Sequence, residues 1–372
     1  MAINLQSAAL AAQFQAFYGA KPRVFEAPGR VNLIGDHTDH AGGLVMPGAI
    51  DRVLRVAAAP NGLNSLRLRS LQQDTIVEAP LEALSRRGDW SDYVCGVAAA
   101  LMRRGLPVAG ADFLIDSDVP PGAGVSSSAA LEAGAALALM RLSDTSLAPM
   151  AIAQLCQEAE NQFVGMPCGL MDQFASVFGQ KDRLLLFDCT SLQYEALPFP
   201  SGLRLLLIES GVTHTHVDSG YAQRRREADA AVSRMKGSGA PTDIPDAVIE
   251  KRMAHITGEN ARVRAMAERL AQGSEATAIG ALVNESHASL RDLFESSHPQ
   301  VDALQEIAAA TPGVYGARIM GGGFGGSVIA VIDAEAADAA ARAIEHAYRQ
   351  ACGVSVAMHI VALSDGAREL IG

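Results

Sequence analysis

The sequence lacks the cysteine patterns that indicate a disulfide framework or a zinc site. Its cysteines are odd in number and include no CxxC pair; they are Cys95, Cys156, Cys168, Cys189 and Cys352. Reduced, buried thiols in an intracellular protein are the default interpretation of such a pattern. We therefore expect a cytoplasmic protein.

The sequence also has no long hydrophobic run, and the composition of residues 1–20 leads us to expect no secretory leader. No stretch is long and apolar enough to predict a membrane span. Residues 1–20 carry no charged side chain, but they lack a basic segment and polar residues interrupt the apolar ones. Leu10, Phe14, Phe17 and Tyr18 form one stripe at helical spacing, which predicts an N-terminal helix.

Positive charge is in the minority. The chain has 30 Lys and Arg against 41 Asp and Glu, a net charge of −11 at pH 7. This balance argues against nucleic acid or an anionic membrane as a partner. With 49% apolar and 19% charged residues among 372, the composition is that of an ordinary globular protein with one large domain or two.

The order of expected elements is typical of an α+β protein. Strands are expected at 23–27, 44–58, 64–78, 112–118, 183–187, 203–208, 314–319, 328–332 and 354–361. Helices are expected at 91–104, from 127, at 150–163, after 169, over most of 219–310 except a loop at 237–245, and at 334–351. A domain boundary is expected near 190–200.

The most informative segment is the run of glycines and serines at 120–130, which follows the strand expected at 112–118. Gly122 and Gly124 allow the backbone to approach a ligand closely. The helix that begins after them presents free N–H groups and its positive dipole end. These features predict a phosphate site, most simply for a nucleotide, although a glycine turn before a helix can also be purely structural.

Two familiar nucleotide motifs are excluded for this run. No Gly-Lys-Ser/Thr follows the glycines, so it is not a Walker A loop. The serines replace the third glycine of a dinucleotide fingerprint. Three adjacent serines favour phosphate and metal contacts over the capping of a helix by one of them.

Three further segments stand out, at 29–40 (GRVNLIGDHTDH), 165–173 (GMPCGLMDQ) and 321–326 (GGGFGG). Together with residues 121–130 they resemble the motifs of the galactokinases, a family of the GHMP kinase superfamily. The similarity continues at 219–226, 289–292 and 313–318, so that it covers nearly the whole chain.

The resemblance implies a two-domain α+β fold with the active site in the cleft between the domains. Residues 1–195 would form a domain like the second domain of ribosomal protein S5, and residues 196–372 a ferredoxin-like α/β sandwich. The implied reaction transfers the γ-phosphoryl group of ATP, with Mg²⁺, to the anomeric hydroxyl of galactose. The expected partners are these small molecules, and a monomer is compatible with the sequence.

For catalysis, the resemblance assigns Asp172 as the base and Arg30 as its neighbour. Phosphoryl transfer needs alignment, charge neutralisation and an acceptor for the hydroxyl proton. A guanidinium at about 4 Å would hold the carboxyl in its charged form and could stabilise the transferring phosphoryl oxygens. An acid in the first turn of a helix can also simply interact with the helix dipole.

The implied Mg²⁺ ligands are a serine of the loop, Ser127 or Ser128, and Glu160. Mg²⁺ typically takes one or two carboxylates together with phosphates and water. Glu132 is a competitor for the same role, and Glu160 could alternatively be a solvated acid on a helix surface.

The implied sugar contacts are the backbone of Gly169 and the side chains of Asp36, His37, Asp39 and Tyr221. Carboxylates accept hydrogen bonds from vicinal hydroxyls, and tyrosine offers a flat apolar face with a polar tip. Zinc binding by residues 36–40 is the alternative for this segment, and helix packing is the alternative for Tyr221.

The implied ATP contacts are Gly122, Gly124 and the serines Ser126, Ser127 and Ser128. Trp90 and Tyr93 resemble a segment near the adenine pocket, although aromatic core packing is nearly as good an explanation. The 321–326 loop is expected to close over the active site near Asp172, with tight packing between domains as the alternative.

Three residues depart from the family pattern. Asp36 stands where galactokinases usually have Glu, His40 where they have Tyr, and Met320 where they have Thr. The shorter Asp36 would withdraw the carboxylate from the C6 hydroxyl of the sugar by roughly 1.5 Å. Galactose is the expected substrate, with a shifted specificity for a similar monosaccharide as the alternative.

Two other classes of protein are alternatives to a kinase. A non-catalytic sugar and ATP sensor would carry an insertion after the serine run, whereas residues 126–131 are uninterrupted. A nucleotide-dependent oxidoreductase would need a strand, a GxGxxG turn and a helix, with an acid some 20 residues further on. The serine run argues against the oxidoreductase.

Overall fold

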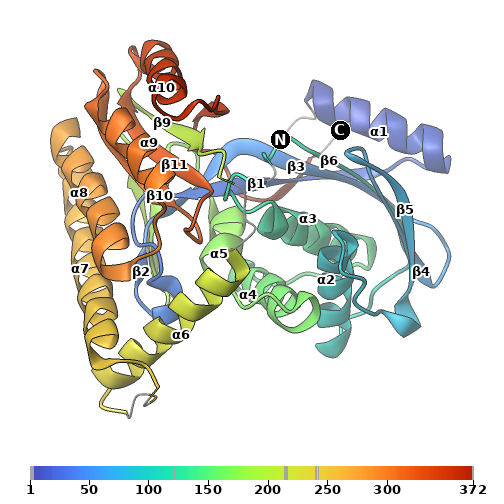
Figure 1. Ribbon diagram of the computed structural model, residues 1–372. Helices are drawn as coiled ribbons and strands as arrows, with labels where there is room; N and C mark the ends of the chain where they lie inside the picture. The colour runs from blue at the N-terminus through green and yellow to red at the C-terminus, as the bar shows by residue number, and fades with distance from the viewer. Residues whose placement is uncertain (1–3, 121, 213–216, 239–240, 242, 371–372) are drawn as a thin grey trace.

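The computed structural model describes residues 4–120, 122–212, 217–238, 241 and 243–370. Pro121, near the start of the predicted phosphate loop, lies outside this set. Helices and three sheets are arranged in two layered units that lie side by side (Figure 1). The α+β class predicted from the sequence is confirmed.

A six-stranded sheet organises the first unit. Among its strand pairs only β4 and β6 run in parallel. In sheet order the strands are β13 (Arg368–Leu370), β1 (Arg23–Asn32), β3 (Pro47–Pro60), β6 (Ala111–Ser117), β4 (Ser65–Ser70) and β5 (Gln73–Pro80).

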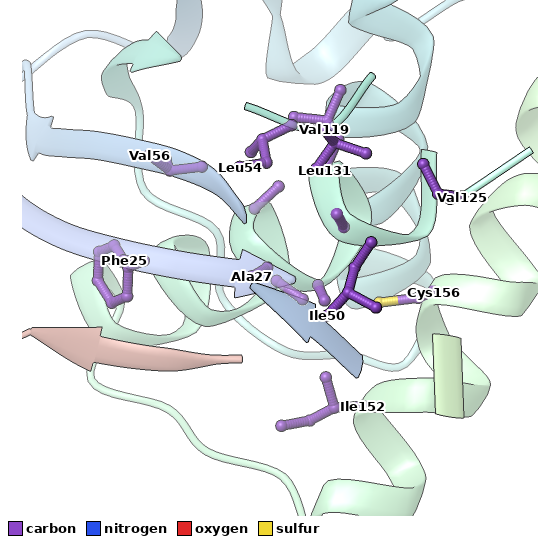
Figure 2. Close-up of a cluster of buried hydrophobic side chains, with 14 of the residues drawn as sticks. Phe25, Ala27, Ile50, Leu54, Val56, Val119, Val125, Leu131, Ile152 and Cys156 are labelled. Atoms are coloured by element: carbon purple, nitrogen blue, oxygen red, sulfur yellow. The ribbon is translucent and has the colours of Figure 1, made fainter. Parts of the chain in front are cut away.

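Helices cover both faces of this sheet (Figure 1). The first helix, α1 (Leu5–Tyr18), lies on one face. The opposite face carries α2 (Ser91–Arg103), α3 (Ser127–Leu142), α4 (Pro149–Ala159) and α5 (Met171–Phe178). Alanine-rich α3 approaches the sheet closely, since a Cβ on Gly134 would lie 3.1 Å from Val56. Figure 2 shows part of the core between them, including Phe25, Ala27 and Ile50.

The second unit is built on an antiparallel sheet in the order β10-β11-β9-β12. Its strands are β9 (Leu203–Glu209), β10 (Val314–Met320), β11 (Ser327–Asp333) and β12 (Met358–Val361). Its helices are α6 (Val217–Met235), α7 (Asp246–Ala271), α8 (Ala276–Ser289), α9 (Pro299–Ala310) and α10 (Ala337–Cys352). A small sheet of β2 (Leu44–Val45), β7 (Arg183–Asp188) and β8 (Tyr194–Pro198) lies outside both larger sheets.

One continuous apolar core joins the two units. Side chains alternate along β9, so that Leu205 and Leu207 belong to the core of the first unit. Leu206 and Ile208 on the opposite face pack with residues of α9 and α10. The second sheet is therefore buried on both faces, and apolar packing joins the two units.

Several expected boundaries differ from the observed ones. The strand expected at 44–58 is two strands, β2 and β3, and the one at 64–78 is the β4–β5 hairpin. Strands β8 and β13 were not predicted. The break expected at 237–245 lies between α6 and α7. The division at 195/196 stays a prediction, and β13 at the end of the chain pairs with β1.

None of the helices that the structure describes combines enough length with enough apolar character to cross a bilayer.

Close backbone packing between α8 and β10 gives a test of the fold. A Cβ on Gly280 would lie 2.0 Å from the carbonyl oxygen of Tyr315. We expect Gly280→Ala to lower the free energy of unfolding by about 1–3 kcal/mol, measured from the urea midpoint, because the helix must move away from the strand. A Cβ on Gly202 would meet nothing within 4 Å, so Gly202→Ala is the control. Equal midpoints for the two variants would contradict this packing.

Candidate active site

The phosphate loop predicted at 121–130 lies directly against β1. The register of β1 with β3 shifts between Pro28 and Arg30, which marks a bulge. At this point the backbone N–H of Arg30 donates to the carbonyl of Val125 over 3.0 Å. A Cβ on Gly29 would lie 2.8 Å from the same carbonyl oxygen. Glycine is therefore required here, and the bulge brings the arginine next to the loop.

Arg30 and Asp172, which the sequence predicts as the catalytic pair, are in contact. Asp172 lies in the first turn of α5, and its two carboxylate oxygens accept from Nε and Nη2 of Arg30, each over 2.8 Å. The third nitrogen, Nη1, donates to the carbonyl of Gly124 over 2.5 Å. The Ser126 hydroxyl also donates to Asp172. One buried guanidinium thus joins β1, the loop and α5.

A cavity of about 200 Å³ opens beside this pair. Its lining includes both members of the pair and all five side chains and backbones predicted to bind the sugar: Arg30, Asp172, Asp36, His37, Asp39, Gly169 and Tyr221. Gly321 and Gly322 of the second unit also line it, as does Glu160. Segments that are far apart in the sequence therefore meet in one hollow.

Asp36 is held by a buried arginine of β10. Its Oδ2 accepts from Arg318 Nη1 over 2.7 Å and from the backbone N–H of Gly321 over 3.2 Å. Oδ1 accepts from Asn32. Burial favours the neutral acid, but the charge and hydrogen bond of Arg318, together with His37 and the hydrogen bond from Asn32, outweigh it and lower the pKa of Asp36. Asp36 is therefore ionised, and Arg318 already occupies much of its bonding capacity.

His37 has a left-handed backbone, with φ of 61°, and its ring stacks on Phe294 with centroids 4.2 Å apart. Burial lowers the pKa of His37 to about 4, so the ring is neutral at pH 7. The Tyr221 ring lies 6.1 Å away. The Tyr221 ring and the neutral imidazole of His37 thus line the cavity from different elements, and Phe294 supports the imidazole from behind.

Gly169 and Asp39 are in close contact. A Cβ on Gly169 would lie 1.8 Å from Asp39 Oδ2, so a side chain at 169 would displace that carboxyl. Burial, together with the nearby charge of Asp172, raises the pKa of Asp39 to about 6. Among the residues that the structure describes, no group of three or more His, Cys, Asp and Glu is arranged to hold a metal ion, so the zinc alternative for 36–40 has no support.

Residues 35–44, which include the predicted sugar contacts Asp36, His37 and Asp39 and are called the sugar segment below, are held by hydrogen bonds from the second unit. Helix α7 supplies three side chains that contact backbone groups of residues 35–44. Glu259 accepts from the N–H of Gly35 over 2.9 Å, and Asn260 accepts from the N–H of Leu44 over 2.7 Å. His255 bonds to the carbonyl of Asp36 over 3.2 Å. The conformation of the sugar segment thus depends on elements more than 200 residues away.

Glu160 begins a π-helical turn, Glu160–Val164, at the end of α4. Its Oε2 accepts from the amide of Gln173 over 2.6 Å, and Ser128 lies within hydrogen-bonding reach. The same Gln173 amide donates to fully buried Glu132, whose Oε1 has no partner. Burial and then the charge of Asp172 raise the pKa of Glu160 to about 7. Carboxylates that lack a neighbouring cation fit a Mg²⁺ ion bound through oxygen.

The residues predicted to contact ATP divide into two groups. On the loop, Gly122, Gly124 and Ser127 are exposed, as a phosphate site requires, and Ser126 and Ser128 are half-buried. Trp90 and Tyr93, at the start of α2, pack against the core and are not part of the cavity lining. Their role in adenine binding stays a prediction, as do the individual ATP contacts of the loop.

Sequence reasoning missed several residues of the site. Arg318 lies in a segment that carries the resemblance but had no predicted role, and Phe294 was not singled out. Met166 and Cys168 line the cavity next to Gly169. The signal available for Arg318 is a charged residue among the apolar ones of a buried strand, which requires a buried partner.

Family models match three parts of the chain. The N-terminal domain of GHMP kinases matches residues 92–180, and the C-terminal domain of GHMP kinases matches residues 266–350. A galactokinase galactose-binding signature matches residues 12–60. The mevalonate kinase of Methanococcus jannaschii, 16% identical, shares the fold with a TM-score of 0.69 over 92% of this chain and 99% of that one. Fold and site together define a GHMP kinase.

Relatives of higher sequence identity show which family of GHMP kinases the chain belongs to. The galactokinase of Roseiflexus sp. strain RS-1 is 39% identical, with 97% of each chain covered. The Chloroflexus aurantiacus galactokinase is 39% identical over 91% of each. The structure of Lactococcus lactis galactokinase complexed with galactose superposes with a TM-score of 0.92 at 30% identity, covering 98% of this chain and 99% of that one. The chain belongs to the galactokinase family.

The raised pKa of Glu160 gives a test of the site. Between about pH 4.5 and pH 7, Glu160 keeps its proton in the folded protein but releases it in the unfolded chain. The free energy of unfolding therefore falls as the pH rises through this range, and the full cost remains above pH 7. We expect Glu160→Gln to gain about 1–3 kcal/mol relative to the parent between pH 5 and pH 8, from urea unfolding in EDTA.

Glu158→Gln, two residues earlier at the end of α4, is the control. Burial opposes ionisation of Glu158, but its hydrogen bonds with Arg103 and Arg104 outweigh this and lower its pKa. The contribution of Glu158 to the free energy of unfolding changes with pH only below about pH 4.5. The difference in that free energy between Glu158→Gln and the parent should therefore be constant from pH 5 to pH 8. A flat difference for Glu160→Gln as well would contradict the charge arrangement.

Proposed function

We propose that this protein transfers the γ-phosphoryl group of ATP to the anomeric hydroxyl of galactose, giving galactose 1-phosphate and ADP. The observation that carries the proposal is the shared cavity. It contains the Arg30–Asp172 pair and the whole predicted sugar set, and Gly321 in its wall lies against Gly124 of the phosphate loop. Its volume of about 200 Å³ is below that of sites for drug-sized ligands and suits a monosaccharide.

In this proposal the sugar lies between Asp39, His37 and Tyr221, with Asp36 towards the second unit. The anomeric hydroxyl faces Asp172, which accepts its proton as the oxygen attacks the γ-phosphorus. Arg30 fixes the plane of the Asp172 carboxylate through two hydrogen bonds and neutralises its charge. The same guanidinium holds the loop at Gly124, so that the donor and acceptor sides of the site are kept in register.

Glu160 and Ser128 are the residues that would hold Mg²⁺. When bound, the ion would neutralise phosphate charge during transfer. Glu132 is too far inside the core for direct contact with a phosphate, and we assign it to the shell that surrounds Glu160.

The other candidate functions have less support. An intact loop leading directly into α3, and the Arg30–Asp172 contact, favour catalysis over a sugar sensor. A dinucleotide-binding unit needs a parallel strand after the helix, whereas α3 is followed by α4. We also infer that the protein works in the cytoplasm, since all five cysteines are free in a fold that buries two of them fully.

The experiment measures the product formed from galactose and MgATP by phosphorus NMR. We expect galactose 1-phosphate, and we expect Asp172→Asn to reduce kcat by about 10²–10⁴-fold while both substrates still bind. Asp144→Asn is the control, because Asp144 is exposed in a turn after α3 and asparagine tolerates its positive φ of 51°. Phosphorylation at C6, or faster turnover of glucose or N-acetylgalactosamine, would refute galactose as the preferred substrate.

A further inference from the structure

Ser126, the first serine of the loop, has an unusual backbone for its residue type. Its φ and ψ are 56° and 58°, the left-handed region. A side chain there costs free energy that glycine would avoid, and such residues cluster at functional sites. The side chain must therefore contribute something that offsets this cost.

The hydroxyl does not perform the usual task of a serine at this position. Ser126 is the N-cap residue of α3, where serine normally accepts a hydrogen bond from a backbone N–H of the first turn. Ser126 makes no such capping bond. Its hydroxyl is turned the other way and donates to Oδ2 of Asp172.

This contact changes which oxygen of Asp172 can act. A carboxylate has about four acceptor positions, two on each oxygen. Oδ2 accepts from Arg30 Nη2 and from Ser126, so both of its positions are filled. Oδ1 accepts one hydrogen bond, from Arg30 Nε over 2.8 Å, while Arg30 Nη2, whose hydrogen bond goes to Oδ2, also lies 2.7 Å from Oδ1. A position on Oδ1 is therefore left for a hydroxyl of the substrate.

We propose that Ser126 is a positioning residue that saturates Oδ2 of Asp172, so that Oδ1 receives the proton of the sugar hydroxyl. The inference rests on the proposed function, in which Asp172 is the proton acceptor. The serine hydroxyl has one hydrogen, and phosphate oxygens only accept. While it donates to Asp172, Ser126 cannot also donate to ATP.

The inference is tested with Ser126→Gly and Ser126→Ala. Glycine suits the left-handed backbone, so Ser126→Gly should fold like the parent, whereas alanine keeps the Cβ and removes only the hydroxyl. We expect kcat to fall by about 10- to 100-fold in both variants, the usual effect of losing one donor to a charged group. The KM values for galactose and for ATP, and the affinity for ATP by calorimetry, should stay within about twofold of the parent.

A double-variant cycle with Asp172→Asn isolates the pair. Because Ser126 acts through Asp172, adding Ser126→Gly to Asp172→Asn should cause no further loss of the residual rate. Ser127→Ala is the contrasting variant. Ser127 is predicted to contact phosphate, so the loss of its hydroxyl should change the KM and the dissociation constant for ATP. A rise in the KM or dissociation constant for ATP of Ser126→Gly, additive losses in the cycle, or full activity of Ser126→Ala would overturn the inference.

The proposed function and this inference fail in different ways. If the parent protein forms no galactose 1-phosphate, the function is wrong. If the parent is active and the Ser126 variants behave as ATP-binding variants, only the positioning role is wrong.

Discussion

The hydrogen bonds of one guanidinium organise this active site. Arg30 lies at a bulge within β1. Two of its guanidinium nitrogens donate to the Asp172 carboxylate, and the third donates to the carbonyl of Gly124. Strand, phosphate loop and α5 are therefore fixed relative to one another before any substrate arrives. Such preorganisation is what phosphoryl transfer requires from a protein, because alignment and charge compensation supply most of the catalysis.

A second constraint comes from the other unit. Arg318 is completely buried, and besides Asp36 it donates to the carbonyls of Asn32 and Leu33. A buried arginine without partners would be very costly, so the two units must dock for either to be stable here. The position of Asp36, a predicted sugar contact, thereby depends on the packing of the units, and the hydrogen bonds from α7 to residues 35–44 add to this dependence.

The sequence predicted the parts of the site that are local. Asp172 in a first helical turn after Pro167-Cys168-Gly169, and a phosphate loop before α3, follow from turn glycines and helix propensity. The break between β2 and β3 and the pairing of β13 with β1 were not predictable, because partners distant in sequence decide them. The same holds for Arg318 and Phe294, whose contacts arise only when β10 and the π-helical turn after α8 reach the sugar segment.

The most direct test of the account is a crystal structure with galactose and a non-hydrolysable ATP analogue. We expect the anomeric hydroxyl within hydrogen-bonding distance, about 2.6–3.2 Å, of Asp172 Oδ1, and the γ-phosphate analogue at the 122–128 loop. Arg30 should keep its contacts with Asp172 and Gly124. A sugar bound with its anomeric carbon turned away from Asp172, or bound outside the cavity between Asp36 and Gly169, would contradict the account.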